Sequence, residues 1–294
     1  MTTTPLTRRQ QPLRGAALLA LSALFFALMG VCVREATANG VNNEMVVFFR
    51  NAVGVVFFLP LAMVRGIHPL KTTRPWAHLK RSGFGLAAMY CYFYALAHLP
   101  LTDAMLFSYA APVFTPLIAH LWLKEPLTPR MWLATAVGFS GVLLVAKPSD
   151  ALISGISLVG ILASVMAASA FVSIREMSDT EPAFRIVFYF ALFSALLSAI
   201  PLLWAWQPLN QTAFLWLIAA GLVASFGQIT MSQAYSCAPQ GLIGPVAYLA
   251  IVFGGWIAWL RWDEVPGHGS LFGAALVFVA GLIPLLRVKT ALKT

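Results

Sequence analysis

Long apolar stretches separated by short polar connections run through the whole chain. A helix of about 20 apolar residues crosses the hydrocarbon core of a bilayer. Cutting the chain at its charges, prolines and glycines leaves ten such stretches, at residues 14–33, 45–64, 77–97, 103–123, 130–146, 156–175, 184–205, 213–235, 241–261 and 269–287. None alternates as a barrel strand would, and backbone groups in lipid need internal partners. The pattern predicts an all-α integral membrane protein with ten transmembrane helices.

Composition supports a lipid environment. The chain is 60% hydrophobic and 10% charged, with a mean hydropathy of +0.82, which is more apolar surface than one soluble core of this size can bury. The net charge of +9 lies in short loops and tails, without interleaved aromatic residues, so we expect no nucleic-acid partner. The three cysteines are isolated, without histidines at ligand spacing, and we expect no metal and no cofactor.

The distribution of basic residues predicts the orientation, because positively charged short loops stay in the cytoplasm. With the first residue inside, the inner side carries Arg8, Arg9, Arg14, Arg65, Lys71, Arg74, Lys80, Arg81, Lys124, Arg130, Arg175, Arg185, Arg287, Lys289 and Lys293. The outer side keeps only Arg34, Lys147 and Arg261. We therefore expect both termini to be cytoplasmic.

The chain also repeats itself. Residues 94–143 align without a gap with residues 233–282 at a constant offset of 139, which matches Tyr109 to Tyr248 and Glu125 to Glu264. This predicts two five-helix domains, 14–147 and 155–288, between tails at 1–13 and 289–294. Because five is odd, the second copy must enter the membrane inverted. Two inverted halves around one central site are the physical basis of alternating access.

Several residues of the first copy form a pattern typical of a known family. They are Tyr94-Ala95-Leu96, Ala104, Pro112 and Glu125-Pro126-Leu127-Thr128. The pattern resembles the drug/metabolite transporter superfamily, more narrowly its bacterial ten-helix branch built from two EamA-type repeats, which includes exporters of amino acids. The second copy departs from it, with Ile251 where Pro112 would repeat. The resemblance implies a multi-pass carrier of the inner membrane and leaves its substrate open.

Arg50 is the one charge that the sequence places inside a span, because all acidic residues fall at segment ends or in loops. It could bind a substrate carboxylate through its bidentate fork, or pair with Asp103 or Glu44 as an outer gate. The alternative is an arginine whose charge reaches the interface along an apolar stem.

Two helix faces carry candidate substrate contacts. Ser225, Gln228 and Ser232 recur at helical spacing, so they share one side of a helix and face either a cavity or a neighbouring helix. Tyr90 and Tyr94 lie on a comparable face of the third span, although tyrosines also populate the membrane interface.

The paired tyrosines Tyr109 and Tyr248 occupy equivalent places in the two copies. Pro112 and the Gly244-Pro245 step lie near them and weaken backbone hydrogen bonding, which either exposes carbonyls to a ligand or produces a packing kink. Tyrosine walls with a few hydroxyl and amide groups suit a small amphipathic solute.

Together these features predict a carrier of small amphipathic metabolites, above all amino acids with aromatic or other hydrophobic side chains, working as an exporter. A nucleoside, vitamin or sugar derivative is the alternative substrate. An integral-membrane enzyme is less well supported because the histidines are scattered and no H-E-x-x-H motif occurs. A channel would need a charged or carbonyl-lined pore, and none is visible. The expected partners are the solute and the bilayer, with the chain as a monomer or homodimer.

Overall fold

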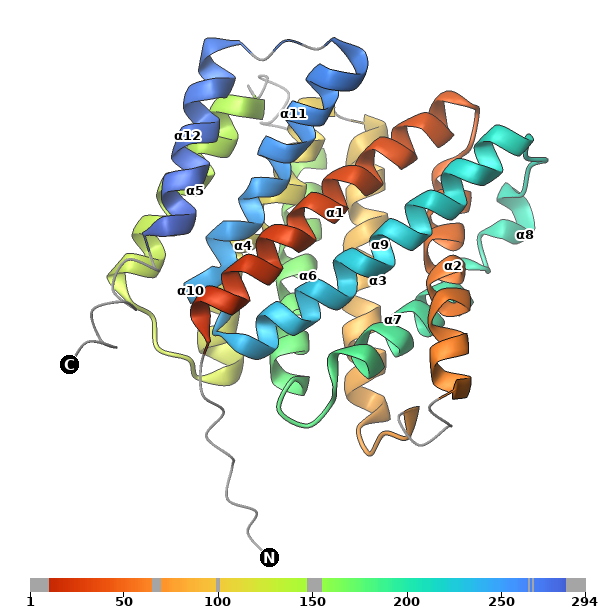
Figure 1. Cartoon of the computed structure of the whole chain (residues 1–294), viewed down its shortest axis with the longest axis horizontal. Coiled ribbons are helices and arrows are strands. Elements are labelled where there is room, and N and C mark those ends of the chain that lie inside the picture. Colours follow the sequence, from red (N-terminus) through yellow and green to blue (C-terminus); the bar gives the residue numbers. More distant parts are fainter. Residues whose placement is uncertain are drawn as a thin grey trace, which may run out of the picture.

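The computed structural model describes residues 11–64, 70–98, 101–146, 155–263, 265 and 267–283, and every regular element in these ranges is helical (Figure 1). The elements are α1 (Pro12–Ala38), α2 (Asn43–Val64), α3 (Pro75–His98), α4 (Leu101–Leu123), α5 (Pro129–Ala146), α6 (Gly155–Met177), α7 (Ala183–Ser198), α8 (Leu202–Ala205), α9 (Gln211–Cys237), α10 (Gln240–Ile243), the 3-10 helix η3 (Gly244–Tyr248), α11 (Leu249–Trp262) and α12 (His268–Leu282).

By length and composition alone, five stretches of described helix are able to cross a membrane. They are Pro12–Ala38, Asn43–Pro60, Gly155–Met177, Gln211–Cys237 and Gln240–Trp262. Three shorter apolar helices, Tyr109–Leu123, Ala183–Ser198 and Leu271–Leu282, accompany them.

Two predicted spans are interrupted in the structure. The stretch 184–205 was expected as one helix, but α7 ends at Ser198 and a separate α8 follows Pro201. The stretch 241–261 is divided into α10, η3 and α11, with Gly244 and Pro245 opening the 3-10 segment. Proline lacks the N–H that an α-helix needs and its ring crowds the preceding turn, so both breaks occur where proline stops regular hydrogen bonding.

The main contacts between helices are related by an exchange of each helix of the first half with its counterpart in the second half. The counterparts are α1 with α6, α2 with α7, α3 with α9, α4 with α11 and α5 with α12. The contact of α1 with α9 then becomes that of α6 with α3, and α1 with α11 becomes α6 with α4. Contacts of α2 with α7 and of α5 with α12 exchange with themselves. Figure 1 shows α1 beside α9 and α5 beside α12.

Glycines allow the closest of these approaches. A Cβ at Gly141 of α5 would lie 2.6 Å from the carbonyl oxygen of Gly273 in α12. A Cβ at Gly138, one turn earlier, would lie 2.6 Å from the ring of Tyr248. Since a real side chain does not fit at such distances, Gly141 lets α5 approach the backbone of α12, and Gly138 lets α5 pack against the Tyr248 ring of η3.

One end of the bundle, drawn lowest in Figure 1, carries the connections α2–α3, α4–α5 and α6–α7, and we call it the basic end. Glu176 at the end of α6 pairs there with Arg74 at 3.0 Å and with Lys80 at 3.1 Å. Arg175 pairs with Glu125 at 3.2 Å. These ion pairs connect the first half of the chain to the second.

A buried carboxylate, Glu181 in the α6–α7 connection, adds to this link. It is 3% exposed and accepts hydrogen bonds from Thr72 Oγ1 at 2.6 Å and Arg185 Nη1 at 2.5 Å. Burial alone would raise the pKa of Glu181, but the hydrogen bonds from Thr72 and Arg185 and the charge of Arg185 outweigh it, and the pKa lies below its usual value of 4.5. The group is therefore ionised at neutral pH and holds the connection to the start of α3.

Candidate functional site

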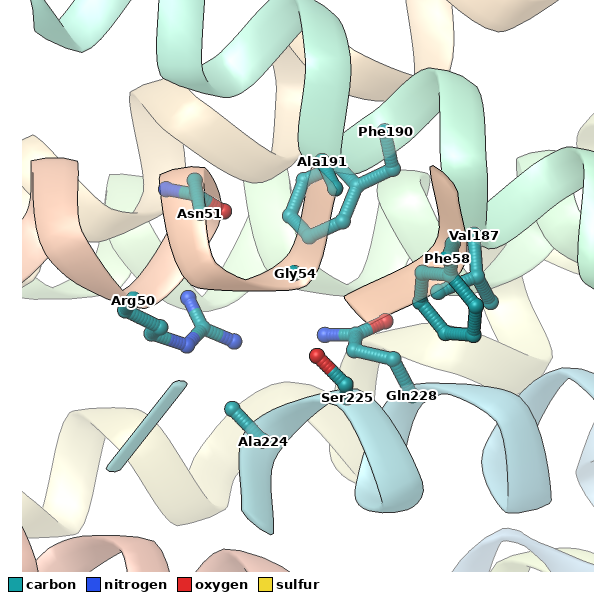
Figure 2. A pocket seen from close by; sticks show the side chains of 10 residues that line it. All are labelled: Arg50, Asn51, Gly54, Phe58, Val187, Phe190, Ala191, Ala224, Ser225 and Gln228. Carbon is teal, nitrogen blue, oxygen red and sulfur yellow. The ribbon is translucent and has the colours of Figure 1, made fainter. Parts of the chain in front are cut away.

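A small cavity lies in the middle of the bundle, where α2, α7 and α9 meet (Figure 2). Its volume is about 10 Å³, which is room for roughly one water molecule. We call it the central cavity. It is lined by Arg50, Asn51, Gly54, Phe58, Val187, Phe190, Ala191, Ala224, Ser225 and Gln228. Arg50, Asn51, Ser225 and Gln228 bring polar groups to this otherwise apolar lining, and a ligand larger than water needs the helices to move apart.

Arg50 supplies one charge to this cavity. Figure 2 shows its guanidinium extending from α2 toward Ser225 and Gln228. Nη1 of Arg50 contacts the sulfur of Met89 on α3 at 2.8 Å, and Nε is buried without a hydrogen-bond partner. Thioether sulfur is a weak acceptor, so most of the hydrogen-bonding capacity of this group is unused.

Arg81 of α3 is a second buried charge, 3% exposed. The sequence counts it among the basic residues of the inner side, and the prediction that Arg50 is the one charge inside a span is wrong. Nη2 of Arg81 donates to the side-chain oxygen of Gln228 at 3.1 Å, and its guanidinium carbon lies 3.8 Å from the ring centre of Phe190. Both partners line the central cavity, so Arg81 of α3 belongs to the wall behind it.

A missing side chain makes room for Arg81. A Cβ at Gly85, one turn further along α3, would lie 2.6 Å from Arg81 Nη1 and 2.8 Å from Phe190 Cε2. The Arg81 side chain therefore runs along α3, over Gly85, into the bundle. Gly54 plays the matching part on α2, where a Cβ would lie 3.2 Å from Ser225 Oγ.

Gln228 links the two arginines, because it lines the central cavity with Arg50 and accepts a hydrogen bond from Arg81. No ion pair joins either of them to a carboxylate among the described residues. Nε and Nη1 of Arg81 are buried without partners, as is Nε of Arg50. Two buried like charges with free donors form a strongly positive site, which favours an anion.

The contact partners of the two arginines are equivalent in the repeat. Met89, which contacts Arg50, and Gln228, which contacts Arg81, are 139 positions apart, the offset of the internal repeat. The site is therefore built on α3 and α9, which exchange with each other, and on α2 and α7, which also exchange.

Of the polar stripe predicted on α9, Ser225 and Gln228 lie in the central cavity. The hydroxyl of Ser225 donates to the backbone oxygen of Gly221 at 2.8 Å. Ser232 lies further along α9, outside the cavity lining; it is 1% exposed and its hydroxyl has no partner.

The tyrosine pair and the helix break lie in another part of the bundle. Tyr248 is fully buried with Val142, Ile251 and Val277, and Tyr109 packs against this cluster. The Tyr248 hydroxyl has no partner. Gly244 and Pro245 are buried in η3, and Pro112 lies inside α4. The structure therefore does not bring these five predicted residues into the central cavity.

The remaining predicted residues are dispersed along α2, α3 and α4. Tyr94 is 49% exposed and stacks on the ring of His98 at 4.2 Å, away from the central cavity. Tyr90 has a buried hydroxyl without a partner. Asp103 lies in α4, and its side chain is outside the described part of the structure. Glu44 makes no ion pair with Arg50 within the described ranges.

A larger space, of about 690 Å³, lies between α1, α2, α7 and α9 toward the basic end. We call it the inner vestibule. It is lined by Gln11, Arg14, Leu18, Phe57, Phe58, Pro182, Ala183, Phe184, Phe226, Ile229, Gln233, Ser236 and Cys237. Phe58, which is 2% exposed, belongs to the lining of both spaces. The Phe58 ring therefore lies between the inner vestibule and the central cavity.

Comparison with known proteins gives consistent results. The model of the EamA-like transporter family matches residues 13–147 and again 153–285. The pseudopaline exporter CntI of Pseudomonas aeruginosa is 36% identical over 94% of this chain and 98% of its own length. The S-adenosylmethionine uptake transporter of Rickettsia bellii is 27% identical over 84% of this chain and 85% of its own. A solved crystal structure, 18% identical, superposes with a TM-score of 0.81 over 96% of this chain and 99% of that one.

Proposed function

Because the chain belongs to the EamA-like transporter family, we propose that it exports a small amphipathic metabolite, an amino acid or a close derivative, by alternating access. The family and the similar relatives are transporters rather than enzymes. The observation that carries the proposal is the central cavity, a closed polar site built from helices that exchange between the two halves.

The mechanism needs ten spans arranged as two inverted domains, 14–147 and 155–288. The exchangeable helix packing supports this arrangement, because the contacts of α1 with α9 and of α3 with α6 become equivalent under a two-fold operation. An odd number of spans in each half then requires the halves to point in opposite directions. Rocking one half against the other would open the central cavity to each side in turn.

The position of the inner vestibule supports the proposed entry of the solute from the basic end. The basic end carries Arg74, Lys80 and Arg175, whereas Arg34 and Arg261 mark the opposite end. Positive residues favour the cytoplasmic side, which would place the vestibule, and both termini, in the cytoplasm of a bacterial inner membrane. A solute would enter there and pass Phe58 to reach the cavity.

Within the cavity, Ser225 and Gln228 provide hydroxyl and amide groups, and Arg50 provides a guanidinium for a substrate carboxylate. This assigns Arg50 to binding rather than to an outer gate. Tyr90, Ser232 and Tyr248 carry buried polar groups without partners, and Tyr109 is half-buried. We keep these four residues as contacts of an opened state.

The experiment is export from proteoliposomes loaded with a panel of labelled amino acids, with and without a pH gradient. At least one amino acid should leave the proteoliposomes faster than it leaves protein-free vesicles, and Gln228→Ala should slow its export. Gln211→Ala, at the exposed start of α9, is the matched control. If no solute in a broad metabolite panel crosses faster than through protein-free vesicles, the carrier proposal fails.

A further inference from the structure

Arg50 lines the central cavity, and Arg81 contacts two residues of that lining, Gln228 and Phe190. Resting on the proposed function, we propose that the substrate is a dianion whose two carboxylates bind Arg50 and Arg81, with Gln228 between them. The inference deepens the proposed function, because it names the charge of the solute rather than only its size.

The charges of Arg50 and Arg81 are not balanced by carboxylates of the described residues. Arg50 and Arg81 are held in the membrane-embedded bundle without a carboxylate partner among the described residues, and they repel each other. An arginine inside a span is costly, and such residues mark solute pathways. Packing would be served as well by an apolar side chain at either position, so the pair of charges calls for a ligand that neutralises both.

Both guanidinium groups also retain unused hydrogen-bond donors. Nε of Arg50 and both Nε and Nη1 of Arg81 are buried and have no partners. The present contacts of the two groups are weak or neutral ones: the Met89 sulfur, the Gln228 oxygen and the Phe190 ring. A carboxylate would replace each of them with charge-assisted hydrogen bonds in the planar fork that guanidinium presents.

The geometry brings both arginines to Gln228. Arg50 comes from α2 and Arg81 from α3, and both reach the space beside Gln228 of α9. In Figure 2, Gln228 lies between Arg50 and Phe58, at the side of the cavity that faces the inner vestibule. A solute arriving from the inner vestibule therefore meets Gln228 before Arg50. The side-chain amide of Gln228 can then contact the part of the solute that lies between its two carboxylates.

The test compares ligands that differ only in one charge. Malonate, succinate, glutarate and adipate, each with its monoamide, are titrated against the purified full-length protein, and affinities are obtained from the ligand-dependent shift of the thermal midpoint. At least one dicarboxylate should bind about tenfold or more tightly than its own monoamide, because a second charge-assisted contact is gained. Inorganic phosphate is a further arm, since phosphate also fits the fork.

Arg50→Gln and Arg81→Gln should each reduce the ratio of the two affinities to near one. Arg130→Gln, which removes an exposed arginine at the start of α5 outside both linings, should leave the ratio unchanged. Arg81→Lys keeps the positive charge and should retain part of the preference for dicarboxylates. This variant separates the effect of losing the charge from the effect of losing the fold.

The proposal is overturned if no dicarboxylate binds more tightly than its monoamide in the unaltered protein, or if phosphate binds more tightly than every dicarboxylate. It is also overturned if the preference survives in both glutamine variants. The comparison in the unaltered protein decides even if a variant does not fold. Export of a neutral amino acid without any dianion preference would remove this inference and leave the proposed carrier function intact.

Discussion

Gly85→Ala is the substitution that tests the construction of the site most directly. It adds one methyl group on α3, at a position where the new Cβ would lie 2.6 Å from Arg81 Nη1 and 2.8 Å from Phe190 Cε2. Ordinary contacts begin at 3.4 Å, so the guanidinium and the ring must each move away by somewhat more than half an ångström. The hydrogen bond from Arg81 to Gln228, now 3.1 Å, lies in the path of that movement.

The size of the effect follows from two opposing terms. Alanine is favoured over glycine in a helix by about 1 kcal/mol, whereas overpacking a well-filled site costs about 1–3 kcal/mol. Gly83→Ala isolates the first term, because Gly83 lies on the same helix, is exposed and has nothing within 4 Å of its added Cβ. The two variants should therefore differ by about 1–3 kcal/mol in the free energy of unfolding.

Two assays check this prediction. The thermal midpoint in detergent should rise or stay constant for Gly83→Ala and fall for Gly85→Ala. The ratio of dicarboxylate to monoamide affinity should fall only for Gly85→Ala, because only that change displaces Arg81. Equal midpoints and equal ratios for the two variants would refute the reasoning that Gly85 exists to accommodate the guanidinium.

Three further predictions concern other parts of the bundle. Since the pKa of Glu181 is lowered, its contribution to stability is present above pH 4.5 and is lost as the pH falls further. The thermal midpoint should drop with acidification in that range, and Glu181→Gln should lower the free energy of unfolding by about 1–3 kcal/mol at pH 7 and flatten the pH dependence of the midpoint. Tyr248→Phe should leave stability unchanged, because the hydroxyl it removes has no partner; a fall of more than about 1 kcal/mol would reveal a hidden hydrogen bond. Gly141→Leu should lower the midpoint by forcing α5 from the backbone of Gly273, whereas Gly30→Leu, with nothing within 4 Å of its Cβ, should not.

Part of the site could be predicted from the sequence. Ser225 and Gln228 stand out because polar residues at helical spacing in an apolar span share one face, and local periodicity is enough to find them. Arg50 stands out because it is a charge far from either end of its span. In each case the signal is contained within one helix.

Arg81 could not be found in this way. It follows Lys80 near the start of α3, so the sequence presents it as one more residue of a basic helix end. Its burial depends on Phe190 of α7 and Gln228 of α9, which are distant in sequence. The local hint was Gly85, one turn later, which leaves the groove that the side chain occupies. Tyr94 shows the converse, since a residue on a suitable face can still point away from the bundle.

The helix break at Gly244 and Pro245 has a consequence for energetics. The corresponding positions of the first copy are Met105 and Leu106, within the continuous α4. If both copies were identical, the inward-facing and outward-facing forms would be degenerate. Under the proposed mechanism, a helix that is divided in one copy and continuous in the other makes the two forms differ in energy, which would bias the unloaded protein toward one of them.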